Sequence, residues 1–265
     1  MGYCESVTKR EIAISARRIA LKTLSKSESP HLGSALSSID YLVHLYVEHL
    51  GESDQIKNNN RLVFSKGHAG IACYSVMAAL GLISTKEIES YCKDGSLFYG
   101  HISHLAHSSI ELSTGSLGHG LPFGIGIAHG KKLKGEDGIV YIVLSDGEMN
   151  EGTTWESALL ARKLQLNNLV CLVDRNRLQS LEDTENTLPL EPLEQKWNSF
   201  GWATSTLNGH SFESLANIEP NLGRPSLYIL ETKKGKGVPW MEDDIRWHYK
   251  WPDVTELKRA LKDLE

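Results

Sequence analysis

The chain has 265 residues, and its 28 lysine and arginine residues against 33 aspartate and glutamate residues give a formal net charge of −5. Apolar residues make up 40% and charged residues 23%, which excludes a disordered chain. The mild negative charge argues against a nucleic-acid partner, because proteins that bind nucleic acid usually carry a strongly basic face.

Two amphipathic helices are predicted near the amino terminus. The first covers residues 8–24 and begins at Thr8 and Glu11, which have the spacing of a capping box. The second covers residues 36–50, where apolar residues recur on one face, and Gly51 is a typical helix stop. No linker, repeat or low-complexity tract follows them, so we expect a single domain over residues 1–265.

Short apolar runs with many β-branched residues follow a different rhythm. They are continuous rather than alternating, as strands are when both faces of a parallel sheet are covered. These predicted strands are residues 62–64, 139–144, 169–173 and 227–230. Helical stretches lie between them, so the sequence predicts an α/β fold: a three-layer α/β/α arrangement around a mainly parallel sheet.

Polar residues follow two of these predicted strands. Asp146 and Gly147 come after the strand 139–144, and Asn176 comes 30 residues after Asp146, the length of one βαβ unit. A right-handed crossover brings the two strand ends together, so both side chains should face one small volume. A carboxylate and an amide oxygen suit Mg²⁺, with phosphate oxygens completing its coordination. The sequence therefore predicts a metal-bridged diphosphate site.

The run that starts at Asp146 has the form Asp-Gly-x-x-x-Glu-Gly. With Asn176 it resembles the thiamine-diphosphate signature of the transketolase family. Four further segments resemble that family's segments in the same order: Ser29-Pro30-His31-Leu32-Gly33, residues 61–69, Gly100-His101 and residues 113–120. The resemblance spans about residues 10–250 and implies the thiamine-diphosphate-binding fold, specifically its diphosphate-binding domain.

The chain stops where the pyrimidine-binding domain of the family would begin. The resemblance therefore implies the N-terminal subunit of a split transketolase, with a separate C-terminal subunit that carries the pyrimidine-binding domain and the catalytic glutamate. An A2B2 heterotetramer, active only as a complex, is the expected assembly. Its reaction would move a two-carbon ketol unit from a ketose donor to an aldose acceptor, with sugars or sugar phosphates as substrates.

The resemblance also implies roles for individual residues. The ligands of Mg²⁺ (or Ca²⁺) would be Asp146, Asn176 and the carbonyl of Leu178. The residues expected to contact thiamine diphosphate are His68, Gly115, Leu117, Gly147, Glu148, Asn176 and Lys236. The residues expected to act in catalysis are His31, His68, His101, Glu151 and His248. Imidazole suits proton transfer, because its pKa lies near neutrality, and Glu151 would reach toward the partner subunit.

Several features of the sequence have other interpretations. The spacing of His101, His104 and His107 is compatible with zinc, although no Cys or carboxylate completes a set of four ligands. The glycines of residues 115–130 are also compatible with a dinucleotide loop, but no clear strand precedes them. Close packing against the cofactor is the interpretation we favour there.

Four positions depart from the pattern of the family. Pro30, Ser145 and His119 replace the usual Gly, Gly and Gln, and Tyr249 follows His248 where Gly is typical. Because these changes lie toward the substrate side, we expect a sugar other than the standard pentose phosphates. Two alternatives remain: another thiamine-diphosphate enzyme, similar to a deoxyxylulose-phosphate synthase or a 2-oxo acid dehydrogenase α chain, and a non-catalytic subunit that only binds a partner.

The compartment is predicted from the termini and the thiols. The first ten residues are too charged for a signal peptide, and no apolar run reaches membrane-spanning length. The four cysteines, Cys4, Cys73, Cys92 and Cys171, contain no CxxC pair, so we expect buried, reduced thiols. The sequence therefore predicts a cytoplasmic protein without a membrane partner.

Overall fold

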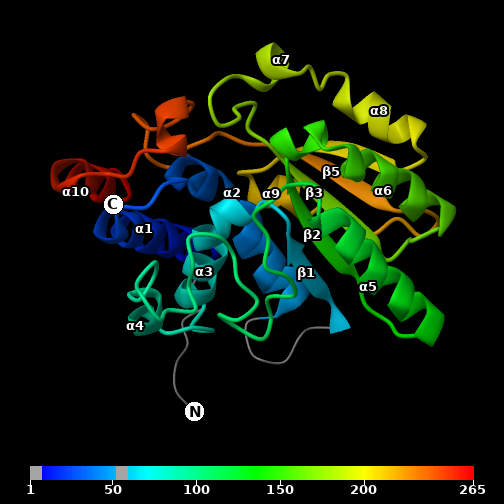
Figure 1. The fold of residues 1–265 in the computed structure, drawn as a ribbon, viewed down its shortest axis with the longest axis horizontal. Coiled ribbons are helices and arrows are strands. Elements are labelled where there is room, and N and C mark those ends of the chain that lie inside the picture. Colours follow the sequence, from blue (N-terminus) through cyan, green and yellow to red (C-terminus); the bar gives the residue numbers. More distant parts are fainter. Residues whose placement is uncertain (1–7, 52–58) are drawn as a thin grey trace.

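Five parallel strands form the centre of the computed structural model, which describes residues 8–51 and 59–265 (Figure 1). Their order across the sheet is β1-β2-β3-β5-β4. The strands are β1 (Arg61–Phe64), β2 (Val140–Ser145), β3 (Leu169–Arg175), β4 (Ala203–Asn208) and β5 (Ser226–Glu231). Four of them confirm predicted strands, whereas β4 was missed, because this edge strand has a polar and largely exposed sequence.

Helices connect the strands and end the chain. The α-helices are α1 (Lys9–Ser27), α2 (Leu32–His44), α3 (Gly70–Ala79), α4 (Thr85–Ile88), α5 (Gly120–Lys134), α6 (Gly152–Lys163), α7 (Thr184–Thr187), α8 (Leu193–Ser199), α9 (Phe212–Leu215) and α10 (Val254–Asp263). A π-helical turn, Leu45–Leu50, continues α2. Short 3₁₀ turns are Gly67–Ala69, Gly147–Asn150 and Ile245–His248.

Both faces of the sheet are buried, each by its own apolar core. Along β2, Tyr141 and Val143 pack with α1, α2 and α3, while Val140, Ile142 and Leu144 pack with α5 and α6. Figure 1 shows the two groups of helices, blue to cyan and green, on opposite sides of the strands. The three-layer α/β/α prediction is therefore confirmed, and the continuous apolar runs exist because both faces of each central strand need apolar side chains.

The predicted helix signals are also found. The Thr8 side chain accepts a hydrogen bond from the Glu11 backbone N–H, and the Glu11 side chain accepts one from the Thr8 backbone N–H, so the capping box of α1 is complete. Gly51 follows the π-helical turn with a φ of 98°, a value that favours glycine. No helix in the described part of the chain is long and apolar enough to cross a membrane.

The cysteines only partly match the prediction of buried thiols. Cys73 and Cys171 are buried, and neither is in a disulfide. Cys92 is exposed, on a loop where its φ of 57° turns the chain, so the prediction was wrong for this residue. Cys4 lies outside the described residues.

Candidate diphosphate and metal site

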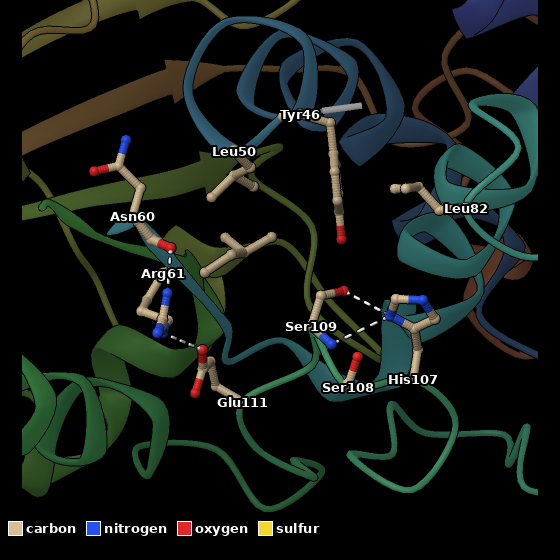
Figure 2. Close-up of a pocket in the computed structure, with 11 residues that line it drawn as sticks. Tyr46, Leu50, Asn60, Arg61, Leu82, His107, Ser108, Ser109 and Glu111 are labelled. Atoms are coloured by element: carbon tan, nitrogen blue, oxygen red, sulfur yellow. Dashed lines mark hydrogen bonds and ion pairs between the residues drawn. The ribbon is translucent and has the colours of Figure 1, made fainter. Parts of the chain in front are cut away.

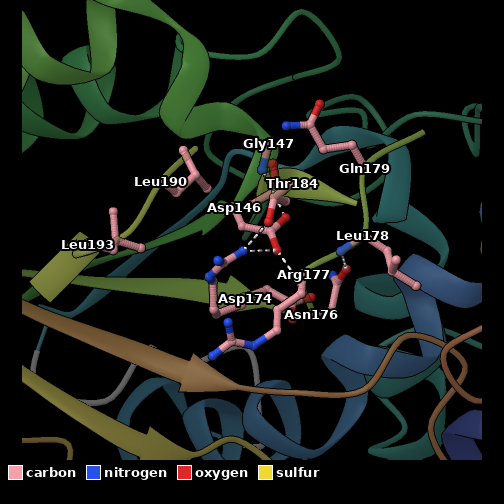
Figure 3. A network of polar contacts seen from close by, with 12 residues as sticks. Asp146, Gly147, Asp174, Asn176, Arg177, Leu178, Gln179, Thr184, Leu190 and Leu193 are labelled. Atoms are coloured by element: carbon pink, nitrogen blue, oxygen red, sulfur yellow. Dashed lines mark hydrogen bonds and ion pairs between the residues drawn. The ribbon is translucent and has the colours of Figure 1, made fainter. Parts of the chain in front are cut away.

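The ends of β2 and β3 bring the predicted metal ligands together. Ser145 pairs with Asp174 across the two strands, so Asp146 and Asn176 follow at neighbouring strand ends. Both residues line one cavity of about 320 Å³, together with Gly147 and Leu178. Figure 3 shows Asp146 in the middle of this region, with Asn176 and Leu178 on the same side of it.

Backbone groups orient the two side chains. Asp146 Oδ1 accepts a hydrogen bond from the Gly147 N–H at 2.8 Å, and Oδ2 accepts one from the Arg177 N–H at 2.7 Å. Asn176 Oδ1 accepts one from the Leu178 N–H at 3.1 Å. Burial raises the pKa of Asp146, and the nearby Asp174 carboxylate raises it further. The result is a set of fixed oxygen donors at the bottom of the cavity.

Most of the residues predicted from the sequence line this cavity. Those that do so are His68, Gly115, Leu117, Asp146, Gly147, Glu151, Asn176, Leu178 and His248. His31 and His101 adjoin it through ring contacts: the His31 ring centroid lies 5.4 Å from that of His68, 5.1 Å from that of His248 and 5.6 Å from that of His101. Four histidines that are far apart in the sequence therefore form one cluster.

The clustered histidines are neutral at physiological pH. Burial lowers the pKa of His31 to about 4, helped by His101 and Lys234, and lowers the pKa of His248 to about 3, helped by Lys234 and His31. Burial and then Lys66 hold the pKa of His68 well below its usual value. A neutral imidazole donates a hydrogen bond from one ring nitrogen and accepts one at the other, so the cluster can bind hydroxyl groups.

Glu148, predicted to approach the diphosphate, points away from the cavity. Its carboxylate is fully buried and accepts hydrogen bonds from the Ser65 hydroxyl, from the Gly118 N–H at 2.8 Å and from the Ser145 N–H at 3.3 Å. The side chain therefore holds the loop before α5 against the ends of β1 and β2. This prediction is corrected to a structural role.

Lys236, the second residue predicted to contact the cofactor, does not line the cavity either. Its ammonium group pairs with Glu242 at 3.3 Å, and its carbonyl accepts a hydrogen bond from Arg17 Nε at 3.0 Å. Gly235 separates it from Lys234, and the φ of +81° at that glycine turns the two side chains apart. Lys234 is the lysine of this loop that reaches the site.

Two buried lysines complete the site, and the sequence did not single them out. Lys234 Nζ lies 3.1 Å from the Leu178 carbonyl oxygen, 2.9 Å from that of Gln179 and 3.0 Å from His248 Nδ1. Lys66 lines the cavity and pairs with the fully buried Asp174. Burial lowers the pKa of Lys234 to about 8, so most of it remains charged at neutral pH.

The residues present fit a divalent cation with a diphosphate. Asp146, Asn176 and the Leu178 carbonyl offer three oxygen donors from two strand ends, the donor type that Mg²⁺ and Ca²⁺ prefer. Lys66 and Lys234 bring positive charge to the same cavity, which suits a phosphate group. By contrast, the described part of the chain holds no cluster of three His, Cys, Asp or Glu residues that could bind a metal, so the zinc interpretation gains no support.

The glycine-rich segment after residue 115 packs against the protein itself. A Cβ atom on Gly118 would lie 2.3 Å from Thr153 Oγ1, and one on Gly120 would lie 2.3 Å from the Ser65 side chain. Only glycine allows this segment to approach the end of β1 and the start of α6. Of these glycines, only Gly115 lines the cavity, so packing against the cofactor is not the main reason for the pattern.

A second cavity lies beside Arg61, at the other end of β1 (Figure 2). Its volume is about 70 Å³, room for a few water molecules but not for a diphosphate. The Arg61 guanidinium pairs with Glu111 at 3.0 Å, and the Ser109 hydroxyl bonds His107 Nδ1 at 2.9 Å. The charged groups of this cavity are therefore paired within its own wall.

Comparisons with known proteins agree with the geometry of the first cavity. A family model described as the thiamine-diphosphate-binding domain of transketolase matches residues 8–261. One of the two subunits of an apulose-4-phosphate transketolase from Phocaeicola vulgatus is 33% identical, with 94% of this chain and 90% of the relative covered. A 6-deoxy-6-sulfo-D-fructose transketolase subunit from a Clostridium species is 30% identical, with 94% and 93% covered.

A solved structure of transketolase from Campylobacter jejuni superposes with a TM-score of 0.88 and is 26% identical. The match covers 97% of this chain and 42% of that chain, so this chain spans less than half of the length of that protein.

Proposed function

The chain belongs to the family of transketolase thiamine-diphosphate-binding domains, and on this premise we propose that it is the N-terminal subunit of a two-subunit transketolase. One observation carries the proposal: Asp146, Asn176 and Leu178 share a cavity with two buried lysines and two of the four clustered histidines. The relative from Phocaeicola vulgatus, named as a subunit, is covered by this chain over 90% of its length, which supports a divided enzyme.

The proposed cofactors are thiamine diphosphate and Mg²⁺ or Ca²⁺. When bound, thiamine diphosphate supplies the nucleophile and the electron sink of ketol transfer. Asp146, Asn176 and the Leu178 carbonyl would hold the cation, while Lys66 and Lys234 would balance the charge of the diphosphate. Leu117 and Gly115, on the opposite wall, would pack beside the rest of the cofactor.

The histidine cluster would bind the sugar. His31, His68, His101 and His248 are grouped beside the cavity, and burial keeps their imidazoles neutral. Each can donate a hydrogen bond to a sugar hydroxyl or accept one from it, and can hold the proton that a hydroxyl loses when the carbon–carbon bond breaks. The chain thus provides binding and proton transfer, and the cofactor provides the reactive carbon.

The proposed partner is a separate C-terminal subunit that carries the pyrimidine-binding domain and the catalytic glutamate. Glu151 is exposed at the mouth of the cavity, immediately before α6. On the same two-helix layer, Leu159 and Leu160 of α6 and Phe123 of α5 are 58%, 48% and 39% exposed, which suits a protein contact. A2B2 assembly, a single domain over residues 1–265 and a cytoplasmic location complete the proposal.

The proposed substrate is a ketose other than the standard pentose phosphates. Tyr249 lies against the cluster, its ring centroid 4.8 Å from that of His248 and 6.4 Å from that of His31. A phenol ring there takes up space that glycine, the typical residue of the family, leaves open. The similar subunits are named for apulose 4-phosphate and 6-deoxy-6-sulfofructose, which supports a non-standard sugar.

Reconstitution tests this proposal. The chain is purified alone and together with a partner of about 300 residues, a size that one or two missing domains would require. Ketol transfer is then assayed with thiamine diphosphate and Mg²⁺. We expect no turnover from the chain alone and activity from the mixture. Turnover without a partner would contradict the divided enzyme, and an inactive mixture that still assembles would indicate a non-catalytic subunit.

A further inference from the structure

Arg175 touches a candidate cation ligand, although nothing in its position on β3 requires an arginine there. Resting on the proposed function, we propose that Arg175 is a positioning residue that fixes two candidate ligands, the Asp146 carboxylate and the Leu178 carbonyl, relative to each other. The role is carried by the directed hydrogen bonds of its guanidinium group and not by its charge alone.

The guanidinium group of Arg175 is almost completely buried, with 1% of the residue exposed. Its Nη1 donates to Thr184 Oγ1 at 2.6 Å and to Asp146 Oδ2 at 3.4 Å. Its Nη2 donates to Glu185 Oε1 at 2.7 Å and to Glu191 Oε1 at 3.0 Å. One rigid planar group therefore joins the end of β2 to the segment that follows β3.

The segment that Arg175 holds contains the second ligand. Leu178 lies in a turn whose two sides meet at Leu178 and Asp183, which form an antiparallel bridge. The Thr184 N–H donates to the Arg177 carbonyl at 2.9 Å and closes the turn at its base. Figure 3 shows Thr184 beside Asp146 and Leu178 on the adjoining strand of this turn. Since Arg175 bonds Thr184 through the same nitrogen that approaches Asp146, it sets the separation of the two ligands.

The charges around Arg175 show why its removal would disturb this geometry. Asp146, Glu185 and Glu191 all direct a carboxylate oxygen to the guanidinium group. Without it, three carboxylates face one another at a site from which water is largely excluded, and they would move apart. Leu190 and Leu193, 2% and 1% exposed, anchor the far end of the segment in the core, so the displacement would fall on the turn that carries Leu178.

Three substitutions separate positioning from charge. Arg175→Lys keeps the charge but cannot reach Thr184, Glu185 and Asp146 together, Arg175→Gln removes the charge, and Thr184→Val removes only one hydrogen bond. Arg177→Gln is the matched control: Arg177 is two residues away, its exposed guanidinium pairs with Glu191 at 3.7 Å and Glu231 at 3.6 Å, and its side chain does not contact Asp146. Circular dichroism and thermal melting identify variants that fail to fold.

The readout is the affinity for Mg²⁺, measured by calorimetric titration into the complex of the chain with its partner, in saturating thiamine diphosphate. We expect Arg175→Lys and Arg175→Gln to weaken Mg²⁺ binding by about 10-fold or more, as loss of a residue that orients metal ligands does. Thr184→Val should weaken it less, and Arg177→Gln should leave it within about twofold.

The outcomes separate this inference from the proposed function. If the natural sequence binds Mg²⁺ and Arg175→Lys binds it equally well, the positioning role is wrong. Tighter binding by Arg175→Gln would also overturn it, because that result is expected if the guanidinium acts only by repelling the cation. If the natural sequence itself shows no binding of Mg²⁺ with thiamine diphosphate, the proposed function fails, whatever the variants do.

Discussion

Burial sets the charge of the residues that face the cavity. It lowers the pKa of His31 to about 4 and that of His248 to about 3, and the ammonium group of Lys234, next to both, lowers them further. Asp174 shows the opposite balance: burial raises its pKa, but its pairing with Lys66 brings the pKa below the usual value. The site thus combines neutral imidazoles with charged lysines, an arrangement suited to a sugar joined to an anionic cofactor.

Tyr249 is the residue that we expect to limit which sugars reach the histidine cluster. Tyr249→Gly should raise kcat/KM for xylulose 5-phosphate with ribose 5-phosphate by about 10-fold, because it removes the ring that narrows the approach to His248. Tyr249→Phe keeps the ring and serves as the control, with little change expected. The assay uses the reconstituted complex, and equal values for all three proteins would show that the ring does not limit access.

The predictability of single residues depended on whether the fold fixes them. Asp146 and Asn176 could be placed together from the sequence, because parallel register brings neighbouring strand ends to one edge of the sheet. The choice between Lys234 and Lys236 could not be made, since it depends on a left-handed turn at Gly235 that spacing does not reveal. Arg175 was missed because its partners, Thr184, Glu185 and Glu191, are brought to it only by the turn after β3.

Helix α5 shows how one element satisfies both the core and the site. Its first residue, Gly120, packs against Ser65 at the end of β1, where the hydroxyl of Ser65 also bonds Glu148. Farther along, Gly126 has open space around its Cα atom. Glycine therefore serves different purposes at two positions of the same helix, and only the first is required by packing.

These two positions should respond oppositely to alanine. Gly120→Ala places a Cβ atom 2.3 Å from the Ser65 side chain and 2.9 Å from its Cα atom, so we expect the free energy of unfolding to fall by about 1–3 kcal/mol. Gly126→Ala meets no neighbour and should raise it by about 0.5–1 kcal/mol, because alanine favours the helix. Urea unfolding of this chain measures both, and equal effects of the same sign would contradict the packing described.

The elements that were predicted best are those with two buried faces. β2 and β3 are apolar throughout most of their length, because helices cover both sides of the sheet. β4 was missed, since an edge strand with one partner and largely exposed side chains carries no such run. The irregular segment 101–119 could not be predicted, as its path follows from contacts with distant residues, such as the bond from the Thr114 hydroxyl to the Phe64 carbonyl at 2.7 Å.

At the scale of the whole molecule, buried histidines make stability depend on pH. His44 is 2% exposed, burial lowers its pKa to about 4, and its ring nitrogens have no hydrogen-bond partner among the described residues. The unfolded chain binds a proton at each such histidine near pH 6.5, whereas the folded chain does so only near pH 4. The free energy of unfolding therefore falls as pH drops from about 6.5 to 4.

His44→Leu tests this dependence away from the candidate site. Each histidine that protonates only on unfolding contributes a slope of up to about 1.4 kcal/mol per pH unit. We expect the variant to show a shallower loss of stability between pH 6.5 and 4.5 by about that amount, measured by urea unfolding at a series of pH values. Parallel curves for the two proteins would contradict the assignment.

The central claim is that the ends of β2 and β3 together hold one divalent cation that binds a diphosphate. The most direct measurement is a crystal structure of this chain with its partner subunit, thiamine diphosphate and Mn²⁺, with the ion located by its anomalous scattering. The account predicts one Mn²⁺ at about 2.2 Å from oxygens of Asp146, Asn176 and Leu178, in contact with the diphosphate. Mn²⁺ at any other position, or a diphosphate bound away from these three residues, would contradict it.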